Sequence, residues 1–382
     1  MSNFIESFKD GQRGKNKGLY LGQGLDNISK AINGVQRHRI YTIASPPKTG
    51  KSTLVDYGFV ISPYLDWLEN CPDMKIEWIY FSFEIDRVSK EFDFVTHFLY
   101  HDFGIERISL EDGQTITINN QKKSIIDLSP DYLRGRLLDD NGHIIKVKES
   151  ILEAVKEVYA KRIIPLFGEY SATGTLITPG KITFIESRDN PTGIWKFLIN
   201  RAEKEGDFIY EYFGEGKKRI RGYNPHNPNK LTIVVLDHIR KCIPERGFNM
   251  KQTVDKMSEM LVELRNLLSY SFAIVIHSNR NIADTERLKF AKDELYIQSE
   301  DLKDSGNLNE DSDYVLSMFN PNDDRYHLTK HFGMTIKDRN NNPIYPNLRT
   351  IHLIESRHCL YPQHFRTNMR GNLKTFEQIK TT

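Results

Sequence analysis

The segment "ASPPKTGKST", residues 44–53, contains a Gly-Lys-Ser tripeptide at Gly50, Lys51 and Ser52 that could bind phosphate. It follows a buried-strand pattern, "IYTIAS", and precedes a helical one, so its N–H groups lie at a helix N-terminus. The lysine would contact β- and γ-phosphate oxygens, and the serine hydroxyl would bind Mg²⁺. We therefore predict a nucleotide site, with an ordinary strand–turn–helix as the alternative. The predicted nucleotide-binding residues are Ser45, Pro47, Lys48, Thr49, Gly50, Lys51, Ser52, Thr53 and Asp237.

The start of this loop departs from the general phosphate-loop pattern, which opens with a glycine. Here that glycine is Ser45, and Pro46 and Pro47 follow it. A proline has no N–H to donate. Because both prolines precede Thr49, the N–H donors from Thr49 to Thr53, which would face the phosphates, are retained.

Two carboxylates end other strand patterns. Asp237 ends "LTIVVLD", the strongest strand pattern in the chain, and could hold Mg²⁺ together with Ser52. The alternative for Asp237 is a helix N-cap. Glu84 ends "IYFSFE" and could polarise an attacking water, or could be an ordinary exposed strand-end carboxylate. With these groups the sequence predicts ATP and Mg²⁺ as the bound species and phosphoryl transfer to water as the chemistry.

The composition excludes several classes of protein. The chain has 382 residues, 38% of them hydrophobic and 27% charged, with a formal net charge of +2. These values are typical of a soluble globular protein, in which nucleic-acid binding would depend on local basic patches. The sequence has no membrane-spanning apolar run and no apolar signal core. The three separated cysteines, Cys71, Cys242 and Cys359, favour a reducing cytoplasm over a disulfide or zinc framework.

Apolar strand patterns alternate with helical ones along most of the chain. This alternation predicts an α/β fold with a mainly parallel twisted sheet and helices on both faces. Helical patterns cover "STLVDYGFVI", a stretch around 194–205, and 254–268. The predicted strands are 40–45, 76–84, 181–187, 231–237, 272–278, 313–319 and 349–357.

Two stretches interrupt this alternation. Residues about 104–180 contain Asp-Gly and Asn-Gly pairs, which predict hairpin turns. Residues about 206–230 are rich in Gly, Pro, Asn and positive charge. We interpret both as insertions with β structure in one domain, residues 36–382, which a polar lead or linker of residues 1–35 precedes.

The order of the motifs resembles that in the ATPase domain of DnaB-like replicative helicases, in the RecA-like superfamily. The resemblance runs from about residue 20 to the C-terminus, apart from the insertions. That family's loop commonly reads Ala-Arg-Pro-x-x-Gly-Lys-Thr, so Pro47 falls on its proline and no first glycine is expected. "YFSFEI", "VVLDHI", "IVIHSNR" and "IHLIESRH" are similar to later motifs of the family. The segment "EDLKDSGNLNEDSDYVLSM" is the most specific match.

The resemblance implies roles for four residues. Glu84 would activate water, Lys51 would stabilise phosphoryl charge, and His277 would occupy the position of the γ-phosphate sensor. The alternative for His277 is a packed strand-end histidine. Arg357 would be the arginine finger, which reaches the ATP of a neighbouring subunit. A rival alignment assigns the inter-subunit role to Lys337 and Arg339.

One residue beside the arginine finger departs from the family pattern. The family lysine two residues before the finger is Glu355 here. A carboxylate cannot contact a γ-phosphate as a lysine does, so we expect sensing between subunits to differ.

In the family, two loops that face a central channel bind single-stranded DNA. They correspond here to residues about 240–252 and 280–310. Cations near an aromatic side chain suit phosphate contact with base stacking, although solvated loops are an equally good interpretation. The predicted nucleic-acid contacts are Arg240, Lys241, Arg246, Lys251, Arg287 and Lys289.

The resemblance implies a hexameric, ring-forming ATPase of phage type that moves on single-stranded DNA during replication. Residues 1–20 would dock on the neighbouring subunit, and primase or loader proteins would be further partners. We expect neither the family's N-terminal helical domain nor a primase module. Two alternatives stay open: a RecA-like recombinase or annealing ATPase that forms filaments, and an ATP-binding scaffold that does not translocate. The expected location is the cytoplasm, that of the host if the protein is viral.

Overall fold

The computed structural model describes residues 17–111, 114–118, 120–214, 216–278, 282 and 285–379. Two compact units divide the chain: a first of residues 1–84, 187–368 and 376–382, and a second of residues 85–186 and 369–375. The second unit contains the predicted insertion of about 104–180 and extends beyond it at both ends. Residues 1–16, most of the segment predicted to dock on a neighbour, lie outside the described part. No helix in the described ranges is long and apolar enough to cross a membrane.

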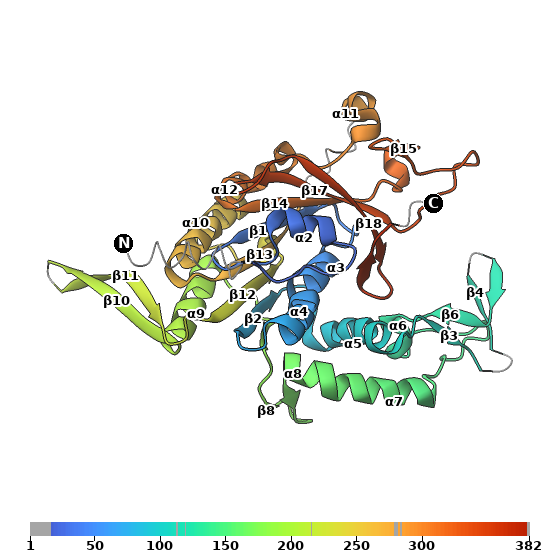
Figure 1. Cartoon of the computed structure of the whole chain (residues 1–382), viewed down its shortest axis with the longest axis horizontal. Helices are drawn as coiled ribbons and strands as arrows, with labels where there is room; N and C mark the ends of the chain where they lie inside the picture. Colours follow the sequence, from blue (N-terminus) through green and yellow to red (C-terminus); the bar gives the residue numbers. More distant parts are fainter. Residues whose placement is uncertain are drawn as a thin grey trace. The chain divides into compact units, whose positions relative to one another are not determined.

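A large sheet forms the centre of the first unit (Figure 1). Its order in this unit is β19-β18-β17-β14-β1-β13-β12-β2. The strands from β14 to β2 run parallel, whereas β17 is antiparallel to both β14 and β18. The predicted mainly parallel sheet is therefore confirmed. The strands are β1 (Ile40–Ser45), β2 (Lys75–Ser82), β12 (Lys230–Asp237), β13 (Ser271–His277), β14 (Tyr314–Phe319), β17 (Leu348–Ser356), β18 (Gln363–Arg370) and β19 (Thr375–Glu377).

Both faces of this sheet are covered. Side chains of a strand alternate between the two faces, and β1, β12, β13 and β14 are buried over nearly their whole length. Such strands must be apolar on both sides, which explains the uninterrupted apolar runs in the sequence. The first unit's helices and turns are α2 (Asp26–Ile32), α3 (Lys51–Val55), η1 (Asp56–Ile61), α4 (Ser62–Asn70), α9 (Pro191–Glu203), η3 (Ile239–Lys241), α10 (Met250–Leu268), α11 (Thr285–Ala291), η5 (Lys292–Glu294), η6 (Ser299–Ser305), α12 (Gly306–Asp311) and η7 (Asp324–Tyr326).

The helix α10 shows how the sequence specifies these elements. Asn249 caps its first turn by accepting a hydrogen bond from the N–H of Gln252, whose side chain bonds back to the N–H of Asn249. The helix ends at Leu268, and Ser269 adopts a left-handed conformation after it. The predicted apolar face is buried, and it comprises Val254, Met257, Leu261, Leu264 and Leu268.

The described part of the predicted N-terminal lead packs into the first unit. Leu19 pairs with Val35 through a β-bridge, and α2 lies between them. Apolar side chains of this segment, including Leu21 and Ile32, are fully buried. Residues 17–35 therefore contribute to the core of the unit.

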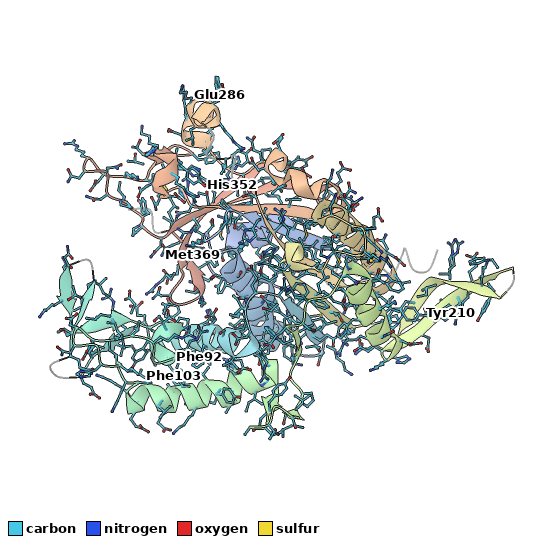
Figure 2. The ribbon with its side chains drawn as sticks, turned by 180° about the vertical axis from the view of Figure 1, so that it is seen from behind. Phe92, Phe103, Tyr210, Glu286, His352 and Met369 are labelled. Atoms are coloured by element: carbon cyan, nitrogen blue, oxygen red, sulfur yellow. The ribbon has the colours of Figure 1, made fainter. Side chains whose placement is uncertain are left out.

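The predicted insertion at about 206–230 forms a two-stranded ribbon, β10 (Gly206–Phe213) and β11 (Lys217–Pro225). Figure 1 shows the ribbon extending away from the sheet, and Figure 2 shows Tyr210 on it. Its side chains are mostly exposed, because neither face of the ribbon is covered along most of its length. Short strands β15 (Lys330–His331) and β16 (Met334–Thr335) form another small hairpin in this unit.

The second unit is built around the helix α5 (Arg87–Phe103), whose N-cap Asp86 accepts a hydrogen bond from the N–H of Ser89. Its aromatic core includes Phe94 and Phe167, with ring centroids 5.1 Å apart. Of the two predicted hairpin turns, the one at Asn141 and Gly142 lies between Leu138 and Ile144, which form a single antiparallel bridge, and the Asp-Gly pair lies outside the described residues. Short antiparallel strand pairs form elsewhere in the unit. The remaining elements are β3 (Arg107–Ser109), β4 (Ile116–Ile118), β5 (Gln121–Lys123), β6 (Ile125–Asp127), α6 (Pro130–Leu133), α7 (Glu149–Val158), η2 (Tyr159–Ile163), α8 (Ile164–Phe167), β7 (Glu169–Tyr170), β8 (Leu176–Thr178) and β9 (Ile182–Ile185).

A buried charged group joins β2, β12 and α9 in the first unit. Glu77 accepts hydrogen bonds from Arg201 at 2.5 Å and from Thr232 at 3.0 Å, and its carboxylate lies 2.8 Å from the ammonium of Lys230. Burial alone raises the pKa of Glu77, but the bonds from Arg201 and Lys230 outweigh it and hold the pKa below its ordinary value of 4.5.

Glu77→Gln tests this network through the dependence of stability on pH. A lowered folded-state pKa stabilises the fold above the ordinary value, and that stability is lost as the pH falls through the folded pKa. We expect Glu77→Gln to lower the free energy of unfolding by about 3 kcal/mol at pH 7, and the difference from wild type to shrink below about pH 4.5. Urea unfolding at several pH values measures this, with the exposed Glu263→Gln as control. A difference that stays constant with pH would contradict the assignment.

Candidate active site

The phosphate loop lies at the carboxyl edge of the parallel strands, between β1 and α3. Thr49 donates its hydroxyl to the carbonyl of Pro46 at 3.0 Å, which closes the first half of the loop on itself. Gly50 has a φ of 107°, a conformation that favours glycine, and α3 begins at the next residue. Ser278 donates its N–H to the carbonyl of Ser45 at 3.1 Å. The loop therefore presents the N-terminus of α3, as the sequence predicts.

Lys51 and Asp237 bring opposite charges to this edge. Both side chains are buried, with exposed fractions of 7% for Lys51 and 3% for Asp237. Burial lowers the pKa of Lys51, and the carboxylates of Asp237 and Glu84 oppose that shift. Ser52 stands next to the lysine in the first turn of α3. A carboxylate and a hydroxyl are oxygen ligands of the kind that Mg²⁺ prefers, so Ser52 and Asp237 fit this ion.

Glu84 follows β2 and is held by residues that come after β12. Its Oε1 lies 3.1 Å from Nζ of Lys241 and 3.4 Å from Nε2 of His238. Partial burial raises the pKa of Glu84, but the bond from Lys241 and the charges nearby outweigh it and hold the pKa below its ordinary value. The carboxylate is therefore ionised near neutral pH, as a general base must be before it accepts a proton.

His277 ends β13 and faces the same group of side chains. Its ring meets that of His238 edge-on, with centroids 4.5 Å apart. Burial, with Lys51 as the next cause, lowers its pKa to about 4, so the imidazole is neutral at pH 7. Its Nδ1 is buried and has no hydrogen-bond partner within the described ranges. A neutral ring with an unused nitrogen is suited to contact a phosphate oxygen.

Glu84, His238 and His277 line a cleft of about 370 Å³. The cleft is bounded by Pro47, Glu84, His238, Arg240, Lys241, His277 and Ser278. The ligand atoms of Glu84, His238 and His277 also lie within 4.8 Å of one another, which a transition metal could use. The ammonium groups of Lys51 and Lys241 oppose a dication there and favour an anion.

Arg349 and Arg357 mark the two ends of β17. Arg349, near its start, donates Nε to the carbonyl of Thr49 in the phosphate loop at 3.0 Å. Arg357 follows its end, is exposed, and donates to the carbonyl of Glu310. A strand of nine residues at about 3.3 Å per residue spans roughly 25–30 Å, so Arg357 lies far from the loop of its own chain.

The rival residues Lys337 and Arg339 lie in the segment between β14 and β17. Lys337 is buried and lies 3.2 Å from Asp324, whereas Arg339 is exposed. A buried lysine that already has a carboxylate partner is poorly placed to reach another subunit.

The six residues predicted to contact nucleic acid occupy three places. Arg240 and Lys241 lie beside the cleft. Further along the chain, Arg246 is exposed in the following loop and Lys251 is exposed at the start of α10. The other two lie on α11, where Figure 2 shows Glu286 standing away from the sheet. Arg287 is engaged there by Asp301 and by the carbonyl of Tyr296, whereas Lys289 is exposed. The second predicted loop includes residues outside the described part, among them 279–281.

Three features of the site were missed by the sequence analysis. They are the contact of His238 with Glu84, the contact of Lys241 with Glu84, and the bond from Arg349 to the phosphate loop. The position of His238 directly after Asp237 is the one signal that could have indicated its place. The other two contacts join segments that are distant in the sequence, so nothing in local spacing reveals them.

The titration of His277 tests the electrostatics of the cleft. We expect its imidazole to lose charge at about pH 4. Lys51→Met should raise this pKa, because it removes a neighbouring cation, and Glu84→Gln should lower it, because it removes a neighbouring anion. Proton–nitrogen NMR of histidine-labelled protein measures each value. Titration of His277 near 6.5 in all three proteins would mean that the side chains are not close together.

No family model matches the chain, and no curated protein matches it by sequence. Among solved structures, the chain is similar to a helicase ATPase domain, with a TM-score of 0.62 and 11% identity over 99% of this chain and 98% of that one. It is also similar to a DnaB-like replicative helicase described with its interactions with primase, with a TM-score of 0.61 and 10% identity over 99% of this chain and 66% of that one.

Identities of 10–11% carry information on the fold and not on the activity. For the fold, the predicted resemblance is confirmed. The chain has the RecA-like α/β P-loop NTPase fold of a DnaB-like helicase ATPase domain.

Proposed function

We propose that this chain is an ATP-driven DNA helicase of the DnaB type, which moves along single-stranded DNA during replication as a hexameric ring. One observation carries the proposal. The phosphate loop, Glu84, Asp237 and His277 come from four neighbouring strand ends. Pro47 of the loop, Glu84 and His277 line one cleft, and the carboxylates of Asp237 and Glu84 both act on the charge of Lys51. The fold shared with helicase ATPase domains supports the same conclusion.

Each of these groups has a role in ATP hydrolysis. Lys51 and the N–H groups of the loop bind the β- and γ-phosphates, and Ser52 and Asp237 hold the Mg²⁺ that neutralises phosphate charge. Glu84 accepts the proton of the attacking water. His277 contacts the γ-phosphate through its neutral ring and responds to its loss. These described residues thus account for the phosphate contacts, the metal ligands and the base. A further cation would stabilise the charge that develops on the far side of the γ-phosphate.

Arg357 supplies that cation to a second copy of the chain. The length of β17 separates it from its own phosphate loop, so it serves the loop of a neighbour. Contacts of this head-to-tail kind produce closed rings when the rotation between copies closes. The ring encloses a channel in which Arg240, Lys241, Arg246 and Lys251 contact the phosphates of single-stranded DNA. Loader or primase proteins are expected partners of such a ring.

Lys51→Ala tests the nucleotide site. Because Lys51 carries the buried positive charge of the loop, we expect its loss to reduce ATP hydrolysis by about 100-fold or more and to abolish unwinding of forked DNA. Lys30→Ala, which changes an exposed lysine on α2, is the control and should leave both activities unchanged. If the wild-type protein hydrolyses ATP and binds DNA but separates no strands, the helicase proposal is wrong. Electron microscopy that shows filaments instead of rings would favour the recombinase.

Mixing two inactive variants tests whether Arg357 acts between subunits. Neither Lys51→Ala nor Arg357→Ala alone should hydrolyse ATP at more than a small fraction of the wild-type rate. In mixed rings, the intact loop of one variant meets the intact arginine of the other at about a quarter of the interfaces. We therefore expect ATP hydrolysis to reappear on mixing, measured by phosphate release. If activity does not return although the subunits exchange, Arg357 does not act on a neighbour.

A further inference from the structure

Lys241 lies both beside Glu84 and at the start of the segment proposed to bind nucleic acid. It lies in the turn η3 directly after β12, so it begins the segment proposed to contact nucleic acid. Its ammonium also lies 3.1 Å from Oε1 of Glu84, the carboxylate proposed to accept the proton of water. Both side chains are partly exposed, Lys241 by 41% and Glu84 by 39%. The ion pair is therefore open to competition from the solvent side.

One ammonium group cannot serve a carboxylate and a nucleic-acid phosphate equally well. An ion pair between partly exposed groups is weak, because water screens both charges. Each phosphate of single-stranded DNA carries one negative charge, as the carboxylate does, but a strand presents a row of them and releases condensed counterions when a lysine replaces them. A DNA strand on the segment of Lys241 therefore draws the ammonium away from Glu84.

The contact with Lys241 also makes Glu84 a poorer base. It occupies one carboxylate oxygen, and it helps to hold the pKa of Glu84 below its ordinary value. A carboxylate of lower pKa takes a proton from water less readily. When Lys241 leaves, His238 remains 3.4 Å from Glu84 and keeps the carboxylate in the cleft. The base is then stronger and is still in position.

We propose that Lys241 is a positioning residue that restrains Glu84, and that single-stranded nucleic acid releases the restraint by taking the ammonium for its own phosphates. ATP hydrolysis then accelerates when DNA occupies the neighbouring segment. The inference rests on the proposed function, in which Glu84 is the base and this segment binds DNA. It adds a residue that couples the two sites directly, without movement of a whole domain.

Lys241→Ala tests the restraint, because loss of the ammonium should raise activity where loss of a supporting residue would lower it. We expect ATP hydrolysis without DNA to increase about two- to fivefold, the factor that a partly exposed ion pair represents. The stimulation by an oligo(dT) strand should fall by a similar factor. Lys241→Arg, which keeps the charge, should behave like wild type. Lys196→Ala, which removes an exposed lysine on α9, should change neither rate.

A second measurement separates the restraint from the proposed activity. Carbon NMR of the Glu84 carboxyl, assigned with Glu84→Gln, gives the pKa of this group in protein without nucleotide. We expect the pKa to rise in Lys241→Ala, and to rise in wild type when oligo(dT) is added. In Lys241→Ala, oligo(dT) should cause no further rise.

The outcomes distinguish the restraint on Glu84 from the proposed helicase function. If Lys241→Ala has wild-type or lower hydrolysis without DNA and keeps the full stimulation by oligo(dT), the restraint is overturned and the proposed function stands. A pKa of Glu84 that is unchanged by Lys241→Ala also overturns the restraint. If instead the pKa rises as expected but wild type hydrolyses no ATP, the restraint on Glu84 stands and the proposed function fails.

Discussion

Parallel strands of one sheet end at one edge, and the candidate site of this chain exists because β1, β2, β12 and β13 do so. Each strand contributes the residue that ends or follows it. The described site residues are therefore positioned by strand ends, and their relative positions are fixed as firmly as the strands of the sheet. Hydrogen bonds that join the strand ends extend the sheet into the site, such as the one from the N–H of Phe83 to the carbonyl of Asp237.

Charge is balanced at this edge by closely spaced groups of both signs. Lys51 and Lys241 lie near Glu84, and burial keeps both histidine rings uncharged. A site that already holds ammonium groups beside uncharged rings can accept a highly charged anion without a large rearrangement of its charges. The same arrangement makes each pKa depend on its neighbours, so a change at one side chain alters the others.

The sequence was most informative where function is tied to strand ends. Asp237, Glu84 and His277 could be placed because apolar runs identify buried strands, and the residue that ends such a run lies at the edge of the sheet. The limits of the second unit could not be placed, since α5 and its neighbours continue the same alternation of patterns that marks the first unit. The contact of Arg349 with Thr49 joins residues 300 positions apart, and it depends on the fold of the whole sheet. The contact of Lys241 with Glu84 depends on the conformation of one short turn, which spacing does not reveal.

The strand β17 has a mechanical consequence. One end is attached to the phosphate loop through Arg349, and ladders to β14 and β18 keep the strand extended. A hydrogen-bonded β-strand is extended and changes its length little, so β17 links the edge of the sheet that holds the phosphate loop to the opposite edge. A displacement of the loop that shifts Arg349 would therefore also shift the far end of the strand. In a ring of the proposed kind, β17 would thus connect the phosphate loop of one copy to the arginine that faces the next copy.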